Sequence, residues 1–180
     1  TNIIMSIDTI IKNISSNYNL VHRLDKETSG LLIIAKNLKY TKLFGRIFSS
    51  QKLNKTYLAL CDGKPKIQES YVDLLINSND KSKTVKTKTL YKVLSSNNKT
   101  SLIKFEPKTG KKHQLRIVAK NLGCPIVGDA KYNVNYKKQK QNLKLNAYKL
   151  QFNIEKKLYN LQSSLPKDFT DYLKLKKIKF

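Results

Sequence analysis

The sequence predicts one α+β domain built on a mostly antiparallel mixed sheet with flanking helices. Apolar residues make up 39% of its 180 residues, which is enough to bury a hydrophobic core. Short apolar runs suited to strands alternate with stretches whose apolar residues recur at helical spacing. No internal repeat or long linker divides the chain, and we expect a single domain.

The N-terminal part begins with isoleucines at helical spacing between residues 3 and 14, and the polar residues 15–19 end that pattern. Two apolar runs follow, Leu20 to Leu24 and Leu31 to Ala35. A polar segment that contains Asp25 and closes on Gly30 separates them. We expect a helix, then a strand, a loop and a second strand.

The later elements are predicted by the same two periodicities and by turn residues. Asp62-Gly63 is a turn signal, Gly123 is a helix stop, and Pro166 suits the first turn of a helix. We expect further helices at 43–48, 113–122 and 167–176, and strands at 56–61, 70–76, 87–94, 100–105, 144–152 and 156–162.

The charge indicates a polyanionic partner. Lys and Arg number 36 against 12 Asp and Glu, a net charge of +24 spread along the whole chain. Lysine greatly outnumbers arginine, which an AT-rich genome would also produce. Cys61 and Cys124 form no CxxC pair and the two histidines lie far apart, so we expect no metal. No apolar run approaches the length of a membrane span and no signal peptide is visible, so we expect a cytoplasmic protein without membrane contact.

The most informative segment is Val21-His22-Arg23-Leu24-Asp25-Lys26-Glu27-Thr28-Ser29-Gly30-Leu31-Leu32. Taken alone, Asp25 would more often be a turn or cap residue than a nucleophile. The whole string, however, resembles the HRLDxxTSGLL signature of the RluA family of pseudouridine synthases.

Three further segments resemble this family, in the family's order. Lys55 to Leu60 resembles its K-x-Y-x-A strand, Pro107 to Tyr132 resembles TGRTHQIR followed by LGHPIVGDxxY, and Leu145 to Phe152 resembles LHAxxLxF. The chain departs from the family pattern at several positions. Lys111 replaces arginine, Lys112 replaces threonine, Cys124 replaces histidine and Asn146 replaces histidine.

The resemblance implies the pseudouridine synthase fold and an isomerisation of uridine in RNA that needs no cofactor. Asp25 is then the nucleophile, which attacks C1′ or the base or acts as a base at C2′. Tyr57 packs against the target base and serves in stacking, proton removal or both. Arg116 pairs with the catalytic aspartate and orients it. An aromatic residue in an apolar strand and an arginine in a basic helix would otherwise be structural or solvated.

The resemblance also implies RNA contacts around these three residues. Arg23 corresponds to the arginine that takes the place of the flipped nucleotide or holds it. The other expected contacts are Lys36, Lys111, Lys112, His113, Gln114 and Leu115. We expect ribosomal RNA of the large subunit as substrate, transfer RNA as the alternative, and a monomeric enzyme.

Family members usually carry a Lys-Pro-x-Gly turn before the aspartate motif and often an S4-type RNA-binding module, and neither is visible here. We therefore expect residues 1–180 to be an N-terminally incomplete catalytic domain. One rival interpretation is an RNA-binding protein that keeps the fold without catalysis. Another, a basic structural protein of the ribosome, explains the lysines but not the motifs. Metal-dependent or nucleotide-hydrolysing chemistry is disfavoured because no P-loop or histidine cluster is present.

Overall fold

The computed structural model describes residues 6–50, 52–77, 83–136 and 141–180. Its helices include α1 (Ile7–Ile14), α2 (Leu38–Ser49), α3 (Gln114–Asn121) and α5 (Lys167–Leu175). Its strands include β1 (Asn19–Leu20), β2 (Ser29–Gly30), β3 (Ile34–Ala35), β4 (Asn54–Asp62), β5 (Glu69–Asn77), β6 (Thr84–Ser96), β7 (Thr100–Pro107), β8 (Leu145–Ile154) and β9 (Lys157–Gln162).

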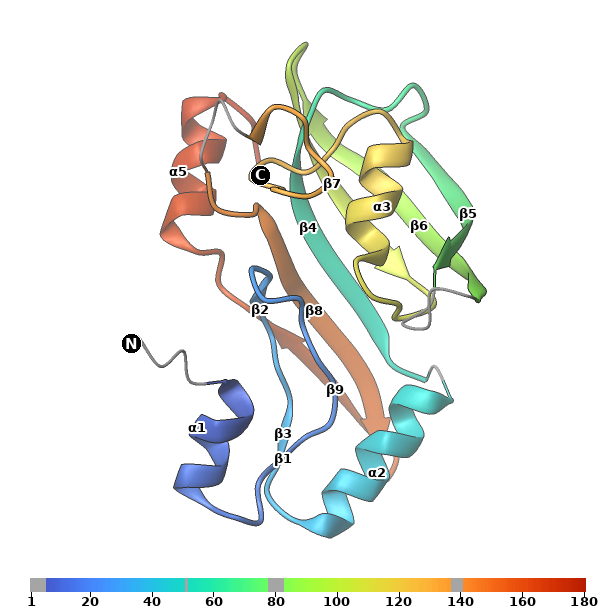
Figure 1. Cartoon of the computed structure of the whole chain (residues 1–180), viewed down its shortest axis with the longest axis vertical. Coiled ribbons are helices and arrows are strands. Elements are labelled where there is room, and N and C mark those ends of the chain that lie inside the picture. Colours follow the sequence, from blue (N-terminus) through green and yellow to red (C-terminus); the bar gives the residue numbers. More distant parts are fainter. Residues whose placement is uncertain (1–5, 51, 78–82, 137–140) are drawn as a thin grey trace.

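One seven-stranded sheet organises the molecule, in the order β2-β8-β4-β7-β6-β5 with β9 paired to β8. All its pairs are antiparallel except the short pairing of β2 with β8, which is parallel. A separate two-stranded sheet joins β1 to β3. Figure 1 shows α3 and α5 beside the upper part of the large sheet and α1 and α2 at its lower end. The α+β prediction with a mostly antiparallel mixed sheet is confirmed.

The two faces of β4 are both buried, because side chains alternate between the faces of a strand. Ala59 and Cys61 belong to the hydrophobic cluster that contains residues of α3, whereas Leu58 and Leu60 belong to the cluster that contains residues of α5. The two helices therefore cover opposite faces of the sheet. This explains why Leu58 to Cys61 form an uninterrupted apolar run.

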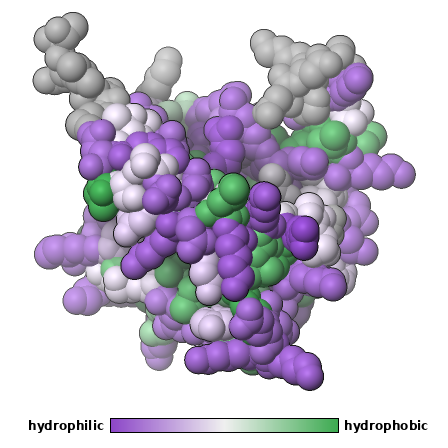
Figure 2. Space-filling view, turned by 90° about the horizontal axis from the view of Figure 1, so that it is seen from below, coloured by the Kyte–Doolittle hydropathy of each residue, from purple (hydrophilic) through white to green (hydrophobic). Residues whose placement is uncertain are grey.

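A third cluster fixes α2 on the lower part of β8. Phe44 packs edge-on against Phe152 with ring centroids 5.3 Å apart, and Ile47 and Leu150 lie beside them. Figure 2 views the molecule from this lower end and shows a mostly hydrophilic surface with smaller apolar patches. None of the helices in the described part of the chain is long and apolar enough to cross a membrane.

The predicted strands at 20–24 and 31–35 are wrong in extent. Only Asn19–Leu20 and Ile34–Ala35 pair as β1 and β3, and most of the residues between them form a loop. Their apolar side chains are still partly buried, since Val21, Leu31 and Ile33 pack against the third cluster. A short apolar run indicates that its side chains are buried, but buried side chains do not require that the backbone pairs as a β-strand.

The other predicted elements are confirmed with small shifts of their ends. The helix predicted from residue 3 is described from Ile7, and Ile3 and Ile4 lie outside the described residues. The helix predicted at 43–48 extends over Leu38–Ser49, because the side chain of Asn37 accepts a hydrogen bond from the backbone of Tyr40 and caps its N-terminus. Lys156 is a positive-φ turn residue before β9 rather than its first residue.

Candidate active site

A cavity of about 590 Å³ opens where the loop after β1, strand β4 and the segment between β7 and α3 come together. Its volume is within the range of small-molecule sites. Many of the predicted site residues line it. The lining includes Arg23, Asp25, Tyr57, Lys111, Lys112, Gln114, Leu115 and Arg116, together with His22, Lys55, Phe48, Thr109 and Gly110.

The loop that carries Asp25 is anchored to β8 by the Thr-Ser-Gly part of its motif. Ser29 accepts a hydrogen bond from the side-chain amide of Asn146 at 2.9 Å. Gly30 has a φ of 106°, and a Cβ at this position would collide with the backbone of Ala147. Glycine is therefore required both for its backbone conformation and for the close approach of β2 to β8.

His22 holds the other side of the same loop. Its Nε2 accepts a hydrogen bond from the backbone N–H of Ile33 at 2.9 Å, and its ring stacks on Phe48 at 4.7 Å. Burial, and then the charge of Lys55, lower the pKa of His22 to about 4. His22 is thus neutral at neutral pH and acts as a structural acceptor.

Tyr57 lies on β4 at an irregularity in its pairing with β8, where the register shifts between Thr56 and Tyr57. The extra residue of this irregularity is Tyr148 on β8, so the bulge lies on the partner strand of Tyr57. Burial, and then the nearby charge of Asp25, raise the pKa of Tyr57 to about 12. The hydroxyl therefore stays protonated at neutral pH, and the ring is available to a base in the cavity.

Arg116 pairs with Asp129, and the expected ion pair with Asp25 is not formed. The Arg116 guanidinium donates to both carboxylate oxygens of Asp129, at 2.6 and 2.8 Å. The arginine is 6% exposed and Asp129 is fully buried. Burial disfavours the charge on Arg116, but the hydrogen bonds and charge of Asp129 outweigh it and raise the arginine's pKa. The charge of Asp25 also raises that pKa, although among the described residues the ion pair of Arg116 within 4.0 Å is with Asp129.

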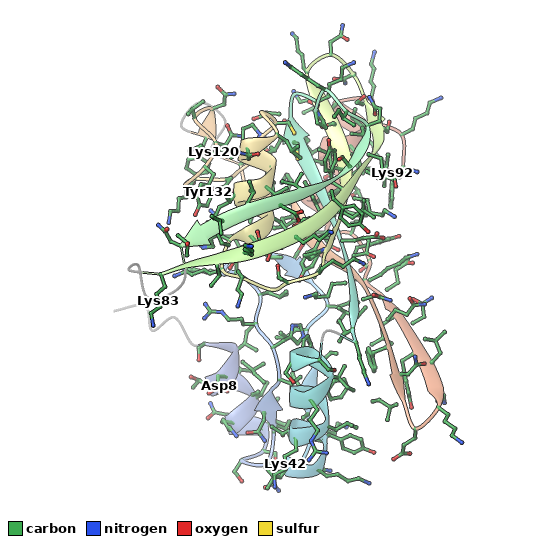
Figure 3. All side chains as sticks on the ribbon, turned by 90° about the vertical axis from the view of Figure 1, so that its right-hand side faces the viewer. Asp8, Lys42, Lys83, Lys92, Lys120 and Tyr132 are labelled. Atoms are coloured by element: carbon green, nitrogen blue, oxygen red, sulfur yellow. The ribbon has the colours of Figure 1, made fainter. Side chains whose placement is uncertain are left out.

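Asp129 also organises the turn that follows it. Its Oδ1 accepts hydrogen bonds from the backbone N–H groups of Lys131 and Tyr132, both at 2.9 Å. The ring of Tyr132 then lies 5.3 Å from the Arg116 guanidinium carbon, and Figure 3 shows this residue beside α3. One carboxylate therefore fixes both an arginine of the cavity wall and the aromatic residue next to it.

Among the described residues, His113 is the basic side chain that lies within ion-pair distance of the Asp25 carboxylate. Its Nε2 lies 4.0 Å from Asp25 Oδ1, and its Nδ1 lies 3.2 Å from the hydroxyl of Tyr132. Burial lowers the pKa of His113, although Asp25 partly opposes this. If the Tyr132 hydroxyl donates its hydrogen bond to Nδ1, the neutral ring carries its proton on Nε2, the nitrogen nearer to Asp25. The residue has a left-handed backbone, with φ 56°, immediately before α3.

The remaining predicted RNA contacts lie in different surroundings. Arg23, Lys111 and Lys112 are exposed residues at the cavity. Gln114 is buried and its amide is occupied within the protein, because it accepts from Thr109 and Lys111 and donates to Thr89. It therefore positions the loop at 109–111.

Leu115 is 7% exposed, belongs to the core cluster at α3 and reaches the cavity wall. Lys36 is exposed directly after β3 and is not among the residues that line the cavity. The structure thus brings together most of the predicted positions but leaves Lys36 outside.

Three residues of the site have no role in the sequence analysis, namely Lys55, Asp129 and Tyr132. All three lie within the family-like segments. One general signal points to Asp129: a buried arginine needs a carboxylate partner, and few are present in this basic chain. Lys55 and Tyr132 stand at fixed positions of the K-x-Y-x-A and LGHPIVGDxxY patterns, but their residue types alone do not indicate the contacts they make.

Comparisons with known proteins agree on one family. The family described as RNA pseudouridylate synthase matches residues 10–121, which include Asp25, Tyr57 and Arg116. An uncharacterized RNA pseudouridine synthase of Zymomonas mobilis is 36% identical over 167 residues, covering 85% of this chain and 75% of that protein. Ribosomal large subunit pseudouridine synthase C of Rickettsia felis is 40% identical over 185 residues, covering 93% of this chain and 60% of that protein.

Solved structures show the same relationship. The human protein RNA pseudouridylate synthase domain containing 4 superimposes with a TM-score of 0.82 at 27% identity, covering 91% of this chain and 77% of that one. The chain spans about half to three quarters of the length of the bacterial relatives that it matches.

Proposed function

The chain belongs to the RNA pseudouridine synthase family, and we propose that it isomerises uridine to pseudouridine in RNA with Asp25 as the nucleophile. The reaction breaks the bond from ribose C1′ to N1 of uracil, turns the base, and joins C1′ to C5. The proton on C5 leaves and N1 gains one, so neither a redox cofactor nor an energy source is consumed. The observation that carries the proposal is that Asp25 and the aromatic residue Tyr57 line the same basic cavity, close enough for the charge of Asp25 to raise the pKa of Tyr57.

Asp25 supplies the carboxylate that stabilises or traps the sugar after the base detaches. The loop that carries it is pinned on both sides, by Ser29 and Gly30 on β8 and by His22 on Ile33. A carboxylate fixed in this way loses little freedom when substrate binds. Nε2 of His113 lies 4.0 Å from the Asp25 carboxylate, and the Tyr132 hydroxyl lies 3.2 Å from the other nitrogen of that ring.

Tyr57 contributes its ring as the surface on which uracil stacks. Burial and Asp25 raise its pKa to about 12 and so disfavour the phenolate, and for this reason we assign removal of the C5 proton to another group. That proton passes to the Asp25 carboxylate, which is free again once C1′ has bonded to C5. Tyr57→Phe should therefore keep most of the activity, whereas Tyr57→Ala should lose both stacking and turnover.

Arg116 acts as a fixed positive charge in the cavity wall rather than as a direct partner of Asp25. Held by two hydrogen bonds to Asp129, it adds positive charge to the cavity wall without competing for the oxygens of Asp25. To Arg23, which is exposed at the cavity, we assign contact with the strand from which the uridine is flipped.

Large-subunit ribosomal RNA is the substrate that we propose. Relatives from Rickettsia felis and Borreliella burgdorferi, 40% and 34% identical, are named ribosomal large subunit pseudouridine synthases C and D. Transfer RNA is the alternative to be compared with it.

The test is tritium release from large-subunit ribosomal RNA transcribed with 5-tritiated uridine, with the Asp25→Asn variant and transfer RNA in parallel. We expect release by the wild-type chain that disappears in Asp25→Asn while RNA binding is kept. Binding without release by the wild-type chain would contradict the proposal and indicate a non-catalytic RNA-binding protein. Release from transfer RNA alone would refute the proposed substrate.

A further inference from the structure

Lys55 is a charged group of the cavity that the proposed mechanism does not use. It lies on β4 and is partly buried, and its Nζ donates a hydrogen bond to the backbone carbonyl of Thr109 at 3.2 Å. The ammonium rests against Gly110, where a Cβ would lie 3.5 Å from Nζ. The side chain is therefore held in one place, whereas Lys111 and Lys112 are exposed.

The charge of Lys55 has no anionic partner in the part of the chain that the structure describes. Each ion pair within 4.0 Å there joins other residues. Its one protein hydrogen bond leaves two of the three ammonium donors for other partners. Burial accordingly lowers the pKa of Lys55 with no opposing contribution. A partly buried charge without a counter-charge is unfavourable for folding, and in a cavity it marks a candidate functional residue.

The position of Lys55 relative to Tyr57 suggests what this charge is for. The two residues are separated by one position on β4, a spacing of roughly 6.6 Å along a strand, and both line the cavity. In a nucleotide one sugar separates the base from its phosphate. A uridine stacked on Tyr57 with its ribose toward Asp25 can therefore direct a phosphate toward Lys55.

We propose that Lys55, with Lys111 and Lys112 beside it, binds the phosphate of the flipped nucleotide. The inference rests on the proposed function, because it assumes that a uridine nucleotide occupies the cavity. Lys55 is the fixed donor of this phosphate site, and the two exposed lysines add to its positive field. The anchoring of the 109–111 loop by Gln114 then sets the distance between the carbonyl that holds Lys55 and the rest of the cavity.

The test compares the affinities of uridine 5′-monophosphate, uridine 3′-monophosphate and uridine, measured by isothermal titration. The proteins are the wild-type chain, Lys55→Met and the control Lys42→Met. Lys42 is exposed on α2 and lies at the lower end of the molecule in Figure 3. Both variants lower the net charge by one, so they share any general electrostatic effect.

We expect at least one monophosphate to bind the wild-type chain more tightly than uridine. Lys55→Met should reduce this advantage about tenfold or more, as expected for the loss of a charged hydrogen bond, and leave the affinity for uridine unchanged. Lys42→Met should behave as wild type. The slope of log affinity against log salt for single-stranded RNA should also decrease by about 0.7 in Lys55→Met relative to Lys42→Met.

An unchanged phosphate advantage in Lys55→Met, or no advantage in the wild-type chain, would overturn the inference. A lower melting temperature with equal loss of uridine and monophosphate binding would assign Lys55 a structural role instead. Tritium release by the same wild-type preparation tests the proposed function separately. Release without a phosphate advantage refutes only the phosphate site, and a phosphate advantage without release refutes only the synthase activity.

Discussion

At the residue scale, Asp129 is the acceptor on which several parts of the site depend. It neutralises Arg116 and orders the backbone of Lys131 and Tyr132. Burial favours its neutral form, but the hydrogen bond from Arg116 and the neighbouring N–H groups outweigh this and lower the pKa of Asp129. It is therefore a carboxylate throughout the neutral range, and removing its charge leaves Arg116 buried without a counter-charge.

Asp129→Asn should lower the free energy of unfolding by about 3 kcal/mol, the typical result of breaking a buried ion pair. Tritium release should fall as well, because Arg116 then competes for Asp25. Urea denaturation and the release assay measure the two effects. The matched control is Asp171→Asn, which removes an exposed pair with Lys167 and should leave stability unchanged. Equal stability of the two variants would rule out the assigned role.

His22 makes the stability of the protein depend on pH. The unfolded chain binds a proton on this histidine near the ordinary pKa of 6.5, whereas the folded chain does so only near 4. The stabilisation is therefore fully present above pH 6.5 and is lost as the pH falls toward 4. Protonation would also remove the lone pair that accepts the Ile33 N–H.

Between pH 7 and pH 4.5 the wild-type chain should lose about 2 kcal/mol more unfolding free energy than His22→Gln. Glutamine can accept the same hydrogen bond through its Oε1 but does not titrate. Urea titrations of both proteins at the two pH values measure the loss of unfolding free energy in each. The contributions of the other titrating groups are the same in both proteins and cancel when the two losses are subtracted. Parallel losses in the two proteins would show that His22 is not the responsible group.

At the scale of elements, the short pairing of β2 with β8 determines where Asp25 lies. Only Ser29 and Gly30 take part, yet the pairing joins the loop to β8, which also pairs with β4 and β9 in the large sheet. The glycine is indispensable to it, because β8 passes where any side chain would be.

Gly30→Ala should separate β2 from β8, lower the unfolding free energy by about 2 kcal/mol or more and abolish tritium release. Gly45→Ala is the control, since a Cβ at that position in α2 meets nothing within 4 Å. Alanine there should stabilise the helix by about 0.5–1 kcal/mol and preserve activity. Denaturation curves and release rates for the pair check both statements, and an active, stable Gly30→Ala protein would contradict the first.

At the scale of the whole molecule, the net charge of +24 should dominate RNA affinity. Four basic residues of the cavity lack a close carboxylate in the described structure, namely Arg23, Lys55, Lys111 and Lys112. Four phosphate contacts with single-stranded RNA predict an affinity loss of about 50-fold between 50 and 200 mM salt. Fluorescence anisotropy over this range measures it, and contacts from other lysines would steepen the loss. A salt-independent affinity would exclude phosphate binding as its source.

The sequence by itself determined the class of fold and most of its elements. Periodicity is a local property, so it identified α2 and the strands β5, β6 and β7 without any knowledge of their partners. The family-like segments likewise singled out Asp25, Tyr57 and Arg116, which all reach one cavity. Residue types at fixed spacing are sufficient for these conclusions.

Only the tertiary structure decided which groups are partners. Asp25 and Asp129 are the same residue type, and the choice of Arg116 between them depends on a turn that folds back onto α3. The residues before and after Asp25 are apolar enough for strands, but a histidine side chain and β8 take their backbone hydrogen bonds. Lys55 is set apart from the exposed lysines by its partial burial in the cavity and by its hydrogen bond to the Thr109 carbonyl. Pairing and burial depend on distances between residues remote in sequence, which no local pattern contains.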